Sequence, residues 1–328
     1  MSTTLFRTYK NTLKSIFFIF VGLLSLSSKA NDFADIEHQT VTIWSQGTRL
    51  AGDIYKPKGL KATDKLPGIL MVPGWGGSKN NIGEKYAPYF AQKGFIVLTF
   101  DFISWGESDG HLLATKPLVT TKYTQEILVK TSHVRGIINP FVMTENVRSA
   151  LYYLGGEPQV TTNNLGIWGT SMGGGLALVV AASDDRVKAL VTQMSPVNYT
   201  YNLRAFPDNK IRQIETLTAR GILPPFPGPK SKINPLLAGY PDWVAMKRFE
   251  PLAYADKLTA ATLIIDAQEE SLFDISQNGQ LLHERIKTRV DSRYMTYPGK
   301  HYDLYKGESL NAARTSALQW FINHLNKP

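Results

Sequence analysis

A chain of 328 residues is long enough to bury the core of one large α/β domain or of two small ones. Its 43% hydrophobic and 19% charged residues exclude a disordered chain and a membrane-embedded one. The formal net charge of +9 falls to about +5 without the first 30 residues, and the remaining bases are scattered, which excludes the dense basic patch of a nucleic-acid-binding protein.

The first 30 residues have the pattern of an export signal. Three bases among the first 14 residues precede an apolar run over residues 15–27, and Ser28-Lys29-Ala30 places small residues where a signal peptidase reads them. The run is shorter than the roughly 20 residues of a membrane-spanning helix. We therefore expect cleavage near Ala30, export to the periplasm or the medium, and no stable membrane anchor. The alternative is an uncleaved anchor.

Residues 31–328 are predicted to form one α/β domain. Alternating apolar residues on both sides of Gln46-Gly47 predict a leading β-hairpin. Continuous apolar strands that alternate with helices then predict a doubly wound, mostly parallel sheet. The predicted strands cover residues 68–72, 95–100, 165–168, 187–194, 261–265 and 293–297, and the predicted helices cover residues 82–93, 143–154, 172–183, 275–286 and 310–325.

Two connections, residues 111–141 and 196–250, are too long for simple crossovers. The second is rich in aromatic rings and prolines. Because open α/β sheets bind ligands at the carboxyl ends of their strands, we expect this segment to form a lid over that edge. The other interpretation is a small satellite core under surface loops. Cysteine is absent, so no disulfide holds either connection.

Ser171 is the predicted nucleophile. It lies in Gly169-Thr170-Ser171-Met172-Gly173, directly between an apolar strand and a helix of small residues. Such a turn is so tight that side chains at the two glycines would collide with backbone, and it exposes the serine hydroxyl. The alternative is a plain glycine-rich turn between a strand and a helix.

A serine hydroxyl needs a base that takes its proton, and a third group that holds the base in one tautomer. Of the six histidines, His301 and His324 follow the last predicted strand, and His324 lies on the final predicted helix. Only His301 lies in a loop that can reach the sheet edge. Four acids follow the strand before it. Asp266 lies at the strand end and Asp274 resembles a helix cap, which leaves Glu270 as the orienting acid and Glu269 as its rival.

The negative charge that forms on the substrate oxygen needs two backbone N–H donors. We expect them from Met172 and from Trp75, in the glycine-rich loop of residues 73–77. The sequence has no closely spaced metal ligands and no dinucleotide fingerprint, so we expect neither a metal nor a cofactor.

Over nearly all of residues 35–326 the chain resembles the α/β-hydrolase superfamily, in particular its dienelactone-hydrolase-like and Xaa-Pro-dipeptidyl-peptidase-like branch. Besides the serine motif, residues 101–110 are similar to the D-x-x-G-x-G-x-S-x-G loop of that branch, with Ser104 in place of the first glycine. The resemblance implies that Glu270 is the acid and that Gly299-Lys300-His301 is the histidine loop. The common H-G before the oxyanion loop is Pro73-Gly74 here, and the usual aspartate is a glutamate.

These observations predict a serine hydrolase that cleaves a carboxylic ester through an acyl-enzyme. The expected partner is a small-molecule ester with an apolar acyl or aryl group, bound by the ring-rich segment of residues 196–250. One alternative is an amide or peptide hydrolase of the Xaa-Pro-dipeptidyl-peptidase-like type. Another, of a different class, is a non-catalytic binding protein on a hydrolase fold.

Overall fold

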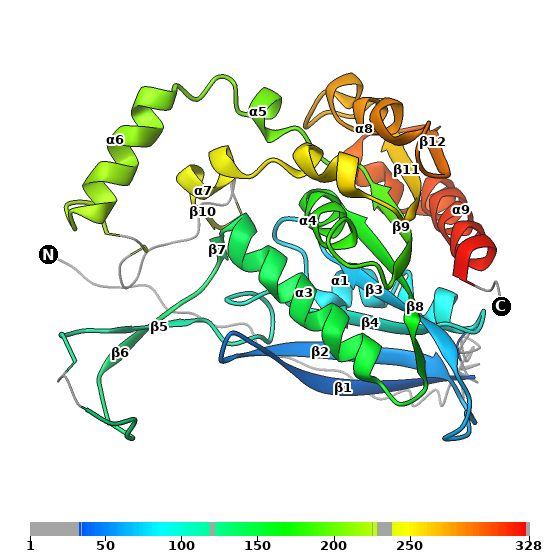
Figure 1. Ribbon diagram of the computed structural model, residues 1–328, viewed down its shortest axis with the longest axis horizontal. Coiled ribbons are helices and arrows are strands. Elements are labelled where there is room, and N and C mark those ends of the chain that lie inside the picture. Colours follow the sequence, from blue (N-terminus) through cyan, green and yellow to red (C-terminus); the bar gives the residue numbers. More distant parts are fainter. Residues whose placement is uncertain (1–32, 34, 119–121, 225, 228–237, 326–328) are drawn as a thin grey trace, which may run out of the picture. The chain divides into compact units, whose positions relative to one another are not determined.

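The computed structural model describes residues 33, 35–118, 122–224, 226–227 and 238–325. The predicted export signal lies outside the described residues. The main feature is an eight-stranded sheet (Figure 1). In spatial order its strands are β1 (Ile36–Ser45), β2 (Thr48–Pro57), β4 (Ile96–Phe100), β3 (Leu66–Val72), β8 (Val160–Thr170), β9 (Val187–Gln193), β11 (Ala261–Ala267) and β12 (Ser292–Tyr297).

The sheet is mostly parallel, as predicted. β1 and β2 form the expected antiparallel hairpin, and Gln46 and Gly47 both have positive φ, as the tight turn of a hairpin requires. β2 also pairs antiparallel with β4, but from β4 to β12 each strand runs parallel to its neighbour. The carboxyl ends of these parallel strands therefore meet at one edge, where α/β sheets bind ligands.

Helices cover both faces of the sheet. One face packs against α3 (Pro140–Gly156), α4 (Met172–Ala181) and α8 (Gly279–Ile286), and the other against α1 (Lys79–Gly83), α2 (Ala87–Ala91) and α9 (Gly307–Leu325). This arrangement is the doubly wound α/β fold that the alternating pattern predicted.

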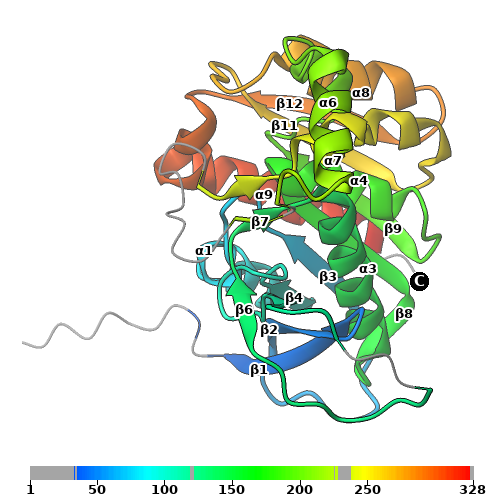
Figure 2. The same ribbon diagram turned by 90° about the vertical axis from the view of Figure 1, so that its left-hand side faces the viewer.

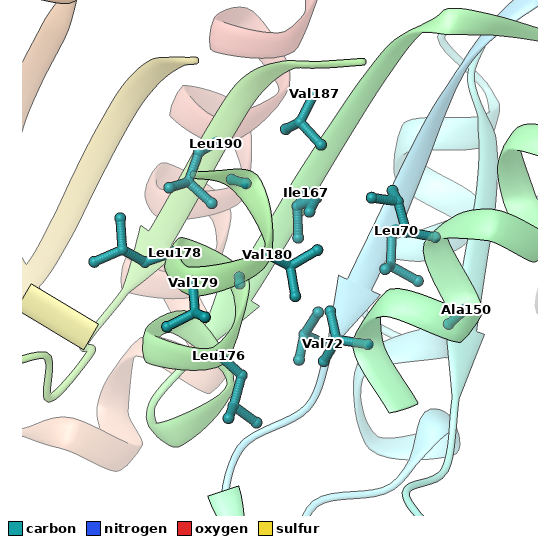
Figure 3. Packing of buried hydrophobic residues seen from close by; sticks show 14 of the residues in the cluster. Leu70, Val72, Ala150, Ile167, Leu176, Leu178, Val179, Val180, Val187 and Leu190 are labelled. Atoms are coloured by element: carbon teal, nitrogen blue, oxygen red, sulfur yellow. The ribbon is translucent and has the colours of Figure 1, made fainter. Parts of the chain in front are cut away.

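The central strands have apolar side chains on both faces because both faces are covered. On β3, Leu70 and Val72 belong to the core under α3 and α4, and Ile69 and Met71 to the core under α2 and α9. Figure 3 shows Leu70 and Val72 beside Ile167 of β8 and the apolar side chains of α4. Burial of each such side chain contributes about 1.5–3 kcal/mol, so this central stretch holds β8, and the turn that follows it, firmly in place.

Two helices are broken where the sequence predicted continuous ones. The prediction of one helix over residues 82–93 is wrong: α1 ends at Gly83 and α2 begins at Ala87. Pro88 explains the break, because proline lacks an N–H and fits only in the first turn of a helix. The predicted helix over residues 275–286 also divides, into η2 (Ile275–Gln277) and α8, at Asn278.

The connection of residues 111–141 contains a second hairpin. β5 (His111–Ala114) and β6 (Thr131–Val134) pair antiparallel and lie apart from the eight-stranded sheet (Figure 1). In Figure 2, which is seen from the left-hand side of Figure 1, β6 lies in front of the sheet. The following β7 (Ile137–Ile138) pairs with β10 (Tyr240–Pro241), which belongs to the other long connection. The two connections are thus joined to each other by a short parallel ladder.

The connection of residues 196–250 contains α5 (Tyr199–Asn202), α6 (Asp208–Ala219) and α7 (Trp243–Arg248), and η1 (Pro251–Lys257) follows it. Residues 225 and 228–237 of this segment lie outside the described residues. Its two ends are joined directly, because the Leu252 N–H donates to the Val197 carbonyl at 2.9 Å.

The side chain of Asn278 fixes the start of the same segment. Its Oδ1 accepts from the N–H groups of Val197 at 2.9 Å and Asn198 at 3.0 Å.

The role of the segment of residues 196–250 as a lid stays a prediction. Within the described part of the chain, no helix combines the length and the apolar character needed to cross a membrane.

Candidate active site

Ser171 occupies a sharp turn between β8 and α4. Its backbone angles are φ +51° and ψ −131°, a conformation that residues with a Cβ rarely adopt. A Cβ at Gly169 would lie 2.5 Å from the Gly173 carbonyl oxygen, and a Cβ at Gly173 would overlap the Pro73 carbonyl oxygen. Neither position has room for a side chain, so both glycines of the motif are needed to form the turn.

His301 and Glu270 form a buried pair. His301 Nδ1 lies 2.8 Å from Glu270 Oε2, and the two side chains are only 2% and 1% exposed. The other carboxylate oxygen, Oε1, accepts from the N–H groups of Ser271 and Leu272 at 2.9 Å each. The carboxylate is therefore held from both sides and can keep the imidazole in the tautomer with its proton on Nδ1.

Of the two acids that the sequence left open, Glu270 is the one that contacts His301. Glu269 is exposed, and its N–H donates to the carbonyl of Gly299 at 3.0 Å. Asp274 accepts from the Ser276 N–H and caps η2, as predicted.

The three groups come from one edge of the sheet. Ser171 directly follows β8, Glu270 follows β11, and His301 follows β12 and begins η3 (His301–Tyr305). Within the described residues His301 is hydrogen-bonded to Glu270 and not to Ser171. In enzymes without substrate, the hydrogen bond from serine to histidine is often long, and it tightens only when substrate binds.

The glycine-rich loop after β3 lies against the serine turn. A Cβ on Gly74 would be 2.9 Å from Ser171 Cβ and 3.6 Å from Ser171 Oγ, so this backbone approaches the hydroxyl closely. Trp75 is the next residue along the loop, and Met172 is the first residue of α4. The first N–H groups of a helix have no hydrogen-bond partner within the helix. The Met172 N–H is therefore suited to bind an anion.

The next part of this loop is anchored by a buried ion pair. Lys79 Nζ lies 2.7 Å from Asp53 and 3.1 Å from Glu107, and Lys79 N–H donates to Asp101 at 2.7 Å. Burial lowers the pKa of Lys79, but the hydrogen bonds with Asp53 and Glu107 outweigh it and raise the pKa overall. The lysine therefore stays charged and ties the loop after β3 to the loop of residues 101–110.

Asp266 is buried at the end of β11, and the structure does not bring it to His301. Neither carboxylate oxygen has a hydrogen-bond partner of good geometry within the described residues. Burial raises the pKa of Asp266 to about 7; the neighbouring Tyr294 hydroxyl partly offsets this, and the charge of Glu270 adds to the rise.

Aromatic rings surround His301. The ring centroids of Phe273, Tyr302 and Tyr305 lie 6.1, 5.1 and 6.3 Å from that of the imidazole. The Tyr305 hydroxyl also lies 2.6 Å from Thr170 Oγ1, one residue before Ser171. No motif in the sequence singles out Tyr305; its position four residues after His301, in the same turn, is the one available signal.

Residues 46–223 match the X-Pro dipeptidyl-peptidase (S15) family, which is more than half of the chain. The chain belongs to this family. The family match contains the glycine-rich loop and the serine turn, whereas Glu270 and His301 lie beyond it. Within the described residues, no cluster of three or more His, Asp or Glu side chains is placed to hold a metal ion.

The chain is also similar to individual proteins and solved structures. An Escherichia coli protein of 31.7 kDa from the traX-finO intergenic region is 24% identical over 80% of this chain and 92% of its own length. An α/β hydrolase from Penicillium has a TM-score of 0.64 at 16% identity, covering 89% of this chain and 100% of its own.

A dienelactone hydrolase from Anabaena variabilis has a TM-score of 0.53 at 17% identity and covers 89% of this chain and 99% of its own. The family identifies a hydrolase of the branch that the sequence resembles, and these neighbours show the α/β-hydrolase fold.

Proposed function

We propose that this S15-family chain hydrolyses carboxylic esters through an acyl-enzyme on Ser171. One observation carries the proposal: a buried Glu270–His301 pair, with a 2.8 Å hydrogen bond, at the sheet edge where the serine turn ends. This pairing of an acid with a histidine has a direct use if the histidine takes a proton from a nearby nucleophile. A binding protein would have no need of it.

In the proposed reaction, Ser171 Oγ attacks the ester carbonyl while His301 Nε2 takes the hydroxyl proton. Glu270 accepts the Nδ1 proton in a hydrogen bond and stabilises the imidazolium that forms. The N–H groups of Met172 and Trp75 donate to the negative oxygen of the tetrahedral intermediate. His301 then returns the proton to the leaving alkoxide. Water, deprotonated by the same histidine, finally releases the acid and restores Ser171.

The environment of the site supports an apolar acyl or aryl group. Phe273, Tyr302 and Tyr305 flank His301, and Trp75 lies beside the glycine that touches Ser171. Such rings bury apolar groups at about 0.8 kcal/mol per methylene. A four-carbon acyl chain is therefore expected to react roughly tenfold faster than a two-carbon chain, measured as kcat/KM, if both added methylenes are buried.

The second candidate is hydrolysis of a peptide after proline, because the family is described as an X-Pro dipeptidyl-peptidase. An enzyme that reads a free amino terminus needs unpaired acids to bind the ammonium group. Three of the four acids of residues 196–250 are paired: Asp208 with Lys247, Glu215 with Arg248, and Asp242 with Ala245 and Asn139. The fourth, Glu250, accepts from the Thr200 N–H through Oε2, and its buried Oε1 has no partner within the described residues. This segment therefore offers no pair of free acids for an ammonium group, which favours the ester.

A substrate panel on one purified sample separates the two candidates. We expect p-nitrophenyl butyrate to react faster than the acetate, and Xaa-Pro p-nitroanilides to react little. A fluorophosphonate probe should label wild type at Ser171 and leave Ser171→Ala unlabelled. If any anilide is turned over faster than every ester, peptide hydrolysis is the better assignment. If Ser171→Ala is still labelled at another serine, Ser171 is not the nucleophile.

We also propose that the chain acts after export, with its first 30 residues removed. The support is the basic, apolar and small-residue pattern of that segment.

A further inference from the structure

One hydrogen bond links the turn that carries the histidine to the strand that carries the serine. Tyr305 is the last residue of η3, which begins at His301, and its hydroxyl lies 2.6 Å from Thr170 Oγ1. Thr170 is the last residue of β8 and immediately precedes Ser171. The bond therefore spans the sheet edge between the two segments that must meet for catalysis.

The direction of this bond follows from its neighbours. Thr170 Oγ1 donates its own proton to the Gln193 carbonyl at 3.3 Å, and the Ser171 N–H donates to the same carbonyl at 2.8 Å. Either hydroxyl can donate in the 2.6 Å bond; with the threonine proton on the Gln193 carbonyl, the Tyr305 hydroxyl is the donor to Thr170. Burial is the first cause of a raised pKa for the Tyr305 phenol, so the donor proton is present throughout the neutral range.

The link matters because the sheet does not join the two residues directly. β9 and β11 separate β8, which carries Ser171, from β12, which leads to His301. Small shifts of two intervening strands would add up in the separation between serine and histidine. Proton transfer from Ser171 Oγ to His301 Nε2 requires a separation of about 2.6–3.2 Å, and a misplacement of about 1 Å costs about 100-fold in rate.

We propose that Tyr305 is a positioning residue that sets the distance between Ser171 and His301 through its hydrogen bond to Thr170. The proposal rests on the proposed function of Ser171 and His301. Tyr305 makes no hydrogen bond to Glu270 or His301 within the described residues, and its ring lies at 63° to the imidazole with 6.3 Å between centroids. It therefore acts on the geometry of the pair and not on the protonation of His301.

The test is Tyr305→Phe, which keeps the ring and removes the hydroxyl. We expect the rate of fluorophosphonate labelling at Ser171, and kcat on p-nitrophenyl butyrate, to fall at least tenfold. KM should stay within twofold, and the apparent pKa on the acidic side of the rate profile should not move, because Glu270 still holds His301. The matched control is Tyr89→Phe, which removes a similar bond between tyrosine and threonine, from Tyr89 to Thr315 at 3.1 Å, away from the site.

The acceptor provides a second, independent variant. Thr170→Ser keeps the oxygen and should retain most of the labelling rate, whereas Thr170→Val should lose as much as Tyr305→Phe. The double variant Tyr305→Phe/Thr170→Val should be no slower than the slower single variant.

The outcomes separate this inference from the proposed function. If wild type labels at Ser171 and Tyr305→Phe labels within twofold of it, the positioning role is overturned and the serine assignment stands. If rate and melting temperature fall together in Tyr305→Phe and Tyr89→Phe alike, the hydroxyl is merely structural and the inference is equally overturned. If wild type is not labelled at Ser171, the proposed function itself fails.

Discussion

The unusual backbone of Ser171 makes a prediction that can be tested without a substrate. At φ +51° and ψ −131°, a residue with a Cβ is strained by about 1–3 kcal/mol, and glycine is not. Ser171→Ala and Ser171→Gly both remove the hydroxyl, but only the glycine releases the strain. Glycine in turn costs about 0.5–1 kcal/mol through the greater freedom of the unfolded chain. The glycine variant should therefore be the more stable by about 0.5–2 kcal/mol.

Thermal melts and urea titrations of the two variants measure this difference. A domain of this size gains about 2–4 °C per kcal/mol, so Ser171→Gly should melt about 1–8 °C above Ser171→Ala. Ser149, inside α3, provides the control: there alanine should be more stable than glycine by about 1 kcal/mol, because glycine weakens a helix. If Ser171→Gly melts at or below Ser171→Ala, the turn is not strained and the reasoning is refuted.

Further predictions concern the acid, the buried carboxyl and export. Glu270→Gln should lower kcat by about 10³–10⁴-fold with KM nearly unchanged, because an amide favours the wrong imidazole tautomer. Glu269→Gln should stay close to wild type. The reverse result in steady-state kinetics would show that Glu269, and not Glu270, is the orienting acid. Asp266 has a pKa of about 7 in the folded chain and about 3.9 when unfolded, so the folded state binds more protons between these values and wild type loses stability as pH rises from about 4 to about 7. Melting temperatures should show Asp266→Asn gaining on wild type across that window, and a difference that stays constant with pH would contradict it. Intact-mass measurement of protein from its native host should give an N-terminus at Asn31, and a membrane-bound chain that keeps Ala30 would favour the anchor.

Local features of the sequence predicted most of the fold. The two glycines around Ser171, the turn at Gln46-Gly47 and the continuous apolar strands each act within a few residues, so their meaning can be read from the chain alone. The choice of Glu270 over Glu269 also has a local basis, because the Glu270 carboxylate accepts from the next two backbone N–H groups and is thereby turned back into the site.

Contacts between distant segments could not be predicted in the same way. The bond from Tyr305 to Thr170 joins residues 135 positions apart, and no pattern in either segment predicts this contact. The break between α1 and α2 can be read from the sequence, since Pro88 disfavours a continuous helix, whereas the apolar pattern alone predicts one. The pairing of β7 with β10 depends on how two long connections meet, which periodicity does not encode.

The hydrogen bond between Leu252 and Val197 closes the connection of residues 197–252 at its base, and Asn278 fixes the same base from the side of α8. The strands on either side are therefore held together whatever the length of the chain between them, although Tyr199, Met246 and Phe249 of that chain also pack in the main core. Lengthening a closed loop twofold costs only about 0.6 kcal/mol, so insertions between these core residues would cost little stability while β9 and β11 keep their places.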